Sequence, residues 1–310
     1  MMLRQAVRTL FRKPMAAALI VATMAVGIGT NVAVFSVADA VLLQRFQYPS
    51  AGELVRVAGN DVHFGQTPFS FLDFQDWCSS QNTFAGISAY TLDDFSVKIG
   101  ANSPTRISAA IITDNYFQIL GLAPPLGRSF TKTENRQMVN PVPVILTDGF
   151  WRKNFSESPK VLGQSFLLNG SLCEVVGVAP PGIEHPPNVE VFLPVGILSQ
   201  TADYNDRENR RFYGIGRLLK NRTAAQAETD LQHIAANLAR TYPHTNAGIS
   251  VILSPELDPS LRNYRTSLYL LIGAAGAVLL IATINIINLR LTQISTRSYE
   301  WGIRAALAAC

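Results

Sequence analysis

The chain has 310 residues, of which 48% are hydrophobic and 15% are charged, whereas an average soluble domain has about 25% charged residues. This composition excludes an intrinsically disordered chain and is unusual for a soluble cytosolic protein. The formal net charge of +4 and the pI of about 9.0 would suit a nucleic-acid partner. The position of the basic residues along the chain decides whether such a partner is expected.

Residues 1–13 predict a cytosolic amphipathic helix that lies on the inner surface of a membrane. Its two faces carry the apolar residues Leu3, Val7, Leu10 and Phe11 and the basic residues Arg4, Arg8 and Arg12. Pro14 stops this helix, because proline has no backbone N–H to donate. A lipid anchor and a contact for a cytosolic partner both fit the pattern.

Residues 14–43 predict a first transmembrane helix with an extracytoplasmic extension. No charged side chain occurs between residues 14 and 38, and about 20 apolar residues cross the hydrocarbon core. A signal peptide cleaved at Ala38-Asp39-Ala40 is the alternative, but the apolar part of a signal peptide is only about 7 to 15 residues long. We therefore expect a retained signal-anchor helix.

A second uncharged run, residues 268–289, predicts a second transmembrane helix. Basic residues precede the first run and follow the second run. The positive-inside rule therefore places both termini in the cytosol and residues 44–267 outside. Residues 44–267 hold 19 basic and 20 acidic side chains, a net of −1. The basic excess therefore belongs to the membrane flanks, and no nucleic-acid partner is expected. Two buried helices of a large soluble core are the alternative.

Small and polar side chains in the two runs predict helix packing within the membrane. Small residues spaced by four let helix backbones approach closely, and asparagine side chains form hydrogen bonds between helices. The candidates are Ala25, Gly29 and Ala33 in the first run and Gly273, Ala277, Asn285 and Asn288 in the second.

Residues 44–267 predict an α+β domain with mixed sheets and helices. Residues 53–59 predict a strand, and residues 70–81 a helix that buries Phe71, Phe74, Trp77 and Cys78. Residues 164–178 predict a hairpin with a type I′ turn at Asn169-Gly170. Further strands are expected at 211–219 and 249–253, and a helix begins with the capping box formed by Thr223 and Gln226. Proline-rich stretches at 123–126, 140–143 and 178–187 suggest two subdomains.

The motifs of common enzymes are not found in the sequence. There is no Gly-Lys dipeptide of a P-loop, no HExxH and no GxSxG. The histidines are scattered singly, and the adjacent carboxylates Asp93 and Asp94 suit a solvated turn. The cysteines Cys78, Cys173 and Cys310 have no metal-ligand spacing, and Cys78 and Cys173 are either a disulfide pair or two buried free thiols. We expect no catalytic centre, metal or cofactor.

Several stretches together resemble the permease subunits of MacB/FtsX-type ABC transporters, with their MacB-like periplasmic core domain. The stretches that carry the resemblance are LRQAVRTLFRKP before the first run, then TDNYFQILGLAPPLGRSF, PVPVILTDGFWRKNF, VLGQSFLLNGSLCEVVGVAPPG and AQAETDLQHIAANLARTYP in the domain, and RSYEWGIRAALAA after the second run. Ala308 stands where the family usually has glycine. The match covers nearly the whole chain.

The resemblance implies a protein of the bacterial inner membrane that transmits motion mechanically for efflux or envelope-linked export. Its implied partners are a separate ABC ATPase subunit, a second permease in a homodimer or pseudo-dimer, the lipid bilayer and a periplasmic adaptor. Residues 290–310 correspond to the segment that couples to the ATPase, with Arg297, Glu300, Gly302, Ile303 and Arg304 as its candidate residues. A basic helix that holds lipid headgroups is the alternative for this segment.

Family members have four spans, so the resemblance also implies that the chain is the N-terminal portion of a permease, truncated after the second span, or part of a duplicated, orphan-type permease. The alternative function is a stand-alone two-span module that binds or senses an envelope ligand without any ATPase. The sequence does not indicate a substrate.

Overall fold

The computed structural model describes residues 24–25, 27–34, 36, 48–100, 103–183, 185–255, 269–281, 283–284 and 287–288. Contacts divide the chain into two compact units, one of Phe46–Pro259 and one of Met1–Arg45 with Ser260–Cys310. The predicted segments 1–13 and 290–310 and most of the span predicted at 14–43 lie outside the described residues, whereas most of the span predicted at 268–289 is described. The described helices include none that is both long enough and apolar enough to cross a membrane.

The larger unit, which we call the core domain, is built on a mixed sheet. Its described strands are β1 (Leu54–Asp61), β2 (Gly65–Thr67), β3 (Phe69–Ser70), β4 (Phe84–Lys98), β5 (Thr105–Ile112), β6 (Leu126–Gly127), β7 (Val142–Leu146), β8 (Ser165–Leu168), β9 (Ser171–Val178), β10 (Val191–Pro194), β11 (Arg210–Leu218) and β12 (Ile249–Ser254).

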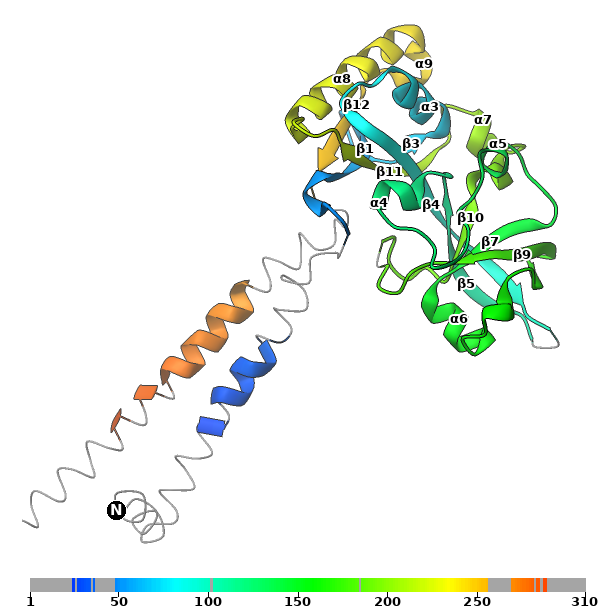
Figure 1. The fold of residues 1–310 in the computed structure, drawn as a ribbon. Coiled ribbons are helices and arrows are strands. Elements are labelled where there is room, and N and C mark those ends of the chain that lie inside the picture. Colours follow the sequence, from blue (N-terminus) through cyan, green and yellow to red (C-terminus); the bar gives the residue numbers. More distant parts are fainter. Residues whose placement is uncertain are drawn as a thin grey trace, which may run out of the picture. The chain divides into compact units, whose positions relative to one another are not determined.

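Helices surround this sheet and connect its strands. The α-helices described in the core domain are α3 (Phe71–Ser80), α4 (Tyr116–Leu120), α5 (Lys132–Arg136), α6 (Asp148–Phe155), α7 (Ala202–Asn205), α8 (Ala224–Thr241) and α9 (Pro243–Asn246). Short 3-10 helices are η2 (Ala51–Glu53), η3 (Pro159–Val161) and η4 (Val195–Leu198). Helices α3, α8 and α9 gather at the end of the unit near β1 and β12, and α6 lies at the opposite end (Figure 1).

The strands follow the order β12-β1-β11-β4-β5-β10-β7-β9-β6. The sheet is mixed, because β5 with β10 and β7 with β9 run parallel, whereas the pairs β1–β11, β4–β5 and β4–β11 are antiparallel. The long strand β4 pairs with β11 through its first half and with β8 at its end, so it joins the two halves of the domain. The halves therefore share one sheet, and the expectation of two subdomains, one inserted in the other, stays a prediction.

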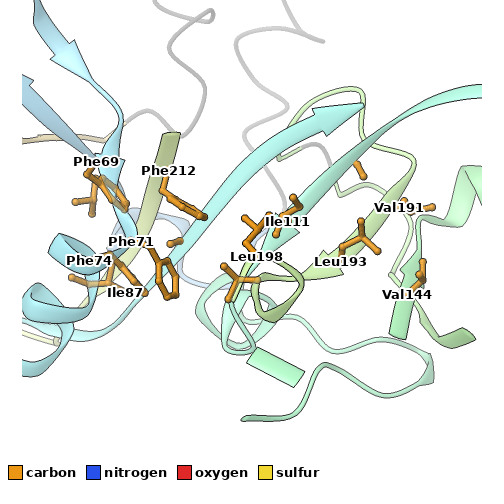
Figure 2. Close-up of a cluster of buried hydrophobic side chains, with 14 of the residues drawn as sticks. Phe69, Phe71, Phe74, Ile87, Ile111, Val144, Val191, Leu193, Leu198 and Phe212 are labelled. Atoms are coloured by element: carbon orange, nitrogen blue, oxygen red, sulfur yellow. The ribbon is translucent and has the colours of Figure 1, made fainter. Parts of the chain in front are cut away.

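Buried apolar side chains form a core that runs through both halves. Phe69, Phe71 and Phe212 belong to the same cluster as Val144 and Val191, and Figure 2 shows the members of this cluster along β4 and its neighbours. A second cluster around Tyr116, Phe117 and Phe192 contains other residues of the same strands, because successive side chains of a strand point to opposite faces. The α+β architecture with a mixed sheet is thus confirmed.

The elements with strong local signals lie where the sequence predicts them. Asn169 and Gly170 have φ of 47° and 82° between β8 and β9, as a type I′ turn requires. Helix α8 begins at the predicted capping box, in which the hydroxyl of Thr223 accepts from the N–H of Gln226 at 3.2 Å. Leu231 is buried on this helix, and Ile234 packs partly buried against the core.

One of the two described cysteines lies elsewhere than the sequence predicts. Cys78 and Cys173 are free thiols, and Cys78 is exposed, whereas the sequence pattern predicts it in the core. The reason is that α3 buries the stripe Asp73, Phe74 and Trp77, and Cys78 lies beyond the edge of this stripe. Cys173 is buried, as expected for the second strand of the hairpin.

Cys173 is expected to resist alkylation in the folded protein. Burial raises the pKa of its thiol from 9.0 to about 11, and the thiolate is the reactive form. At pH 8 the thiolate fraction falls with this pKa by roughly 100-fold relative to the unfolded chain. Iodoacetamide labelling, followed by mass spectrometry with and without urea, measures the two rates at Cys173. Equal rates would contradict the buried position.

Acid is expected to weaken the fold around α5 through Glu134. Burial favours the neutral carboxyl, but hydrogen bonds from Arg128, at 2.7 and 2.9 Å, and from the N–H of Thr131 outweigh it and lower the pKa of Glu134. A lowered folded-state pKa stabilises the protein above the unfolded value of 4.5, and this contribution is lost as pH falls below it. Thermal unfolding should therefore show the advantage of the wild type over Glu134→Gln shrinking between pH 6 and pH 3. A difference that is independent of pH would contradict this role.

Candidate functional site

The predicted coupling residues cannot be placed in the fold. Arg297, Glu300, Gly302, Ile303 and Arg304 lie outside the described residues. Their role stays a prediction from the sequence.

The candidate packing residues of the two predicted spans are exposed where they are described. They are Ala25, Gly29, Ala33, Gly273, Ala277 and Asn288, and Asn285 lies outside the described residues. A Cβ added at Gly29 or Gly273 would meet no atom of the described residues within 4 Å, so these two glycines are not packed against the described part of the other segment. Their packing against other helices stays a prediction.

A different face of the first helical segment contacts the second one. The side-chain amide of Asn31 donates to the carbonyl oxygen of Gly27, at 2.8 Å, and to that of Ala275, at 3.1 Å. Val34 and Ala275 are buried beside it, with 8% and 4% of their surface exposed. Gly27, Asn31 and Val34 follow the i, i+4, i+7 spacing of one helix face. The asparagine within an apolar run was the sequence signal for this contact.

The chain enters the core domain through a cluster of hydrogen bonds around Arg217, which we call the entry cluster. From β11, the guanidinium of Arg217 donates to the carbonyl oxygen of Pro49 at 3.1 Å and to the carboxylate of Glu53 at 3.2 Å. Its Nε donates to the carbonyl oxygen of Ile119 at 2.8 Å. The Arg217 side chain is 15% exposed. One partly buried side chain thus joins the entering segment to β11 and α4.

The chain leaves the core domain beside the point at which it enters. Strand β12 pairs with β1 over six residues, from Arg56 opposite Ser254 to Asp61 opposite Ile249. The first and the last strand of the domain are therefore hydrogen-bonded neighbours.

A pocket of about 720 Å³ opens near the middle of the sheet. It is lined by Arg56 of β1, by Tyr90 of β4, and by Arg211 and Tyr213 of β11, together with His185. Val55 and Val57, the neighbours of Arg56, face the core cluster that contains Leu231 of α8, so Arg56 points to the opposite face of the sheet. We call this hollow the Arg56 pocket.

The polar groups around the Arg56 pocket are unevenly paired. Arg211 forms ion pairs with Asp203 and, at 3.0 Å, with Asp93. Arg56, which is 6% exposed, lies 4.7 Å from the ring centroid of Tyr213, and its Nε has no hydrogen-bond partner. The Tyr116 hydroxyl donates to the carbonyl oxygen of His185 at 2.8 Å. The described residues contain no cluster of three or more side chains suited to bind a metal ion.

The sequence expectations did not include Arg56 or Arg217 as functional residues. Both are arginines inside strands whose neighbouring residues are apolar or glycine, in LVRVA and GIGRL. A charged side chain in such a strand points away from the apolar face and needs its own partners. This interruption of the pattern was the available signal.

A family model described as the MacB-like periplasmic core domain matches residues 17–234. The chain belongs to this family. The resemblance to MacB-like permeases that the sequence motifs indicate is thereby confirmed. The α+β core domain is the part of the chain that carries the family fold.

Several curated relatives of this chain carry the name macrolide export ATP-binding/permease protein MacB. The protein of Acinetobacter baylyi is 20% identical over 239 residues, which are 76% of this chain and 34% of that protein. The protein of Bradyrhizobium diazoefficiens is 24% identical over 254 residues, 80% of this chain and 37% of that protein. The chain thus spans about a third of the length of the curated relatives it matches.

Solved structures agree with the fold of the MacB-like core domain. The periplasmic region of MacB from Actinobacillus actinomycetemcomitans matches with a TM-score of 0.52 and 14% identity, covering 73% of this chain and 98% of that one. A domain of a putative permease protein from Porphyromonas gingivalis matches with a TM-score of 0.52 and 14% identity, covering 72% and 99%. Members of this family are components of ABC transporter permeases, and the core domain of these permeases is extracytoplasmic.

Proposed function

We propose that this chain is the permease part of a MacB/FtsX-type ABC transporter. In this role it transmits motion from a separate ABC ATPase subunit across the inner membrane to the core domain, for efflux or envelope-linked export. The observation that carries the proposal is the family match over residues 17–234.

The neighbouring entry and exit strands support a mechanical role. Because β1 and β12 are paired over six residues, a movement of the segment before β1 and a movement of the segment after β12 both act on the same sheet. The entry cluster joins the first of these segments to β11 and α4 through Arg217. A domain held in this way moves as a body when its base moves, since packed cores deform little.

The proposed topology follows from the charge pattern. Residues 14–43 and 268–289 cross the membrane, both termini lie in the cytosol, and the core domain is periplasmic. Two permeases form a homodimer or pseudo-dimer, in which the small residues of the spans pack against helices of the second permease. A periplasmic adaptor is a further partner of the core domain.

The coupling segment is proposed to contact the ATPase through Arg297, Glu300, Gly302, Ile303 and Arg304. The test is to express the intact gene with candidate ATPases and to isolate the complex through a tag on the permease. We expect an ATPase to copurify with the wild type, and at least tenfold less with Glu300→Ala or Arg304→Ala. Arg290→Ala is the matched control, because it removes a basic residue of the same flank outside the proposed contact.

The outcomes separate this function from its alternatives. If Arg290→Ala and Arg304→Ala reduce ATPase recovery equally, the segment acts as a basic helix for lipid headgroups and the coupling assignment fails. If no ATPase copurifies with the intact protein, the stand-alone binding or sensor module replaces the transporter proposal.

A further inference from the structure

The Arg56 pocket holds a positive charge that the described part of the protein does not neutralise. Arg56 is buried, with only 6% of its surface exposed, and it takes part in none of the ion pairs that the described residues form. Its Nε is buried without an acceptor. Stacking on the ring of Tyr213 is its one favourable contact of note, and such a contact is worth about 0.5 to 2 kcal/mol. A buried charge without an anion costs more than this.

The other two arginines of the pocket differ in how their charge is compensated. Arg211 is neutralised by the carboxylates of Asp93 and Asp203. Arg210 donates to the carbonyl oxygen of Thr245 through its Nη2, but it forms no ion pair among the described residues and its Nε has no acceptor. Arg56 and Arg210 therefore line the pocket without a carboxylate partner among the described residues, which suits a ligand that carries negative charge.

The walls of the pocket are suited to an apolar or aromatic body. The rings of Tyr90, Tyr213 and His185 and the side chain of Leu92 line it beside the guanidinium. Its volume of about 720 Å³ lies within the range of pockets for small organic ligands, about 300 to 1,000 Å³. Arginine matches the planar carboxylate group particularly well, because two of its N–H groups can donate side by side.

We propose that the Arg56 pocket binds a small organic anion, namely a carboxylate attached to an apolar or aromatic body. The carboxylate pairs with Arg56, and the body packs against the tyrosine rings. This binding belongs to the core domain itself and requires neither an ATPase nor a second permease.

A binding role predicts an unusual stability effect for Arg56. A buried guanidinium whose partner is a ligand destabilises the ligand-free protein. Replacing such a buried charge by an apolar side chain is often neutral or stabilising. Arg56→Met should therefore keep or raise the melting temperature of the ligand-free protein. A structural ion-pair residue would show the opposite.

The test uses the full chain in lipid nanodiscs and two probes of nearly equal shape, phenylacetate and the neutral phenylacetamide. We expect phenylacetate to bind the wild type at least tenfold more tightly than the amide in calorimetric titrations. Arg56→Met should lose this preference. The matched control is Arg106→Met, because Arg106 is a strand arginine whose side chain is 79% exposed and paired with Asp94. It should keep the preference.

Three outcomes would overturn the proposal. They are equal binding of phenylacetate and phenylacetamide to the wild type, no binding of phenylacetate at millimolar concentration, and an unchanged preference in Arg56→Met. The first two need no variant, so they hold even if Arg56→Met fails to fold. Failure of the ATPase to copurify affects none of them, so this test is independent of the transporter proposal.

Discussion

Asp73→Ala is expected to destabilise the core domain by about 3 to 5 kcal/mol, because it removes a buried carboxylate that has one buried and one partly buried partner. Asp73 is 1% exposed on α3 and accepts from Arg207 at 2.7 Å and from the side-chain amide of Asn246 at 2.9 Å. Asn246 is itself 3% exposed, so the substitution leaves its amide without this acceptor. Chemical unfolding followed by tryptophan fluorescence measures the loss.

Asp76→Ala is the matched control, since Asp76 binds the same arginine. The Asp76 carboxylate lies 2.6 Å from Arg207, but its side chain is 38% exposed, against 2% for Asp73. Solvent weakens the exposed pair, and we expect a loss of at most about 1 kcal/mol. Similar losses in the two variants would contradict a role for burial at Asp73.

The case of Asp73 shows why the buried face of α3 was only partly predictable. The apolar residues Phe74 and Trp77 indicate the buried stripe in the sequence. Asp73 also belongs to this stripe, but its charge makes the position look exposed. The charge is tolerated there because Arg207, 134 residues later, supplies the partner. A pattern that assigns burial from polarity alone therefore shifts the stripe, and it wrongly places Cys78 in the core.

Elements whose chemistry is local were predictable, whereas pairings over long distances were not. The Asn169-Gly170 turn and the Thr223 cap are fixed by residues that are adjacent or three apart. By contrast, β10 pairs in parallel with β5, about 80 residues earlier, and nothing within either strand specifies this partner. The entry cluster and the Arg56 pocket depend on such pairings, so both emerge only from the fold.

Gly127→Ala is expected to be as damaging as Asp73→Ala, for a reason that lies in the backbone. Gly127 pairs with Gly177 between β6 and β9 at a φ of 82°. A Cβ at this position would collide with the carbonyl oxygen of Val176 and approach the Cα of Gly177 to 2.7 Å. These are backbone atoms, so no side-chain rotation relieves the collision, and we expect a loss of about 3 to 5 kcal/mol or failure to fold.

Gly170→Ala separates the collision from the cost of a positive φ. Gly170 has the same φ of 82°, but a Cβ there would meet no atom within 4 Å. It should lose only the cost of placing an L-residue in the left-handed region, about 1 to 2 kcal/mol. Because the two glycines have the same positive φ, the difference between the variants in unfolding free energy measures chiefly the close approach of β6 to β9. Equal losses would mean that β6 can move away from β9 without cost, and that the edge of the sheet is looser than its register implies.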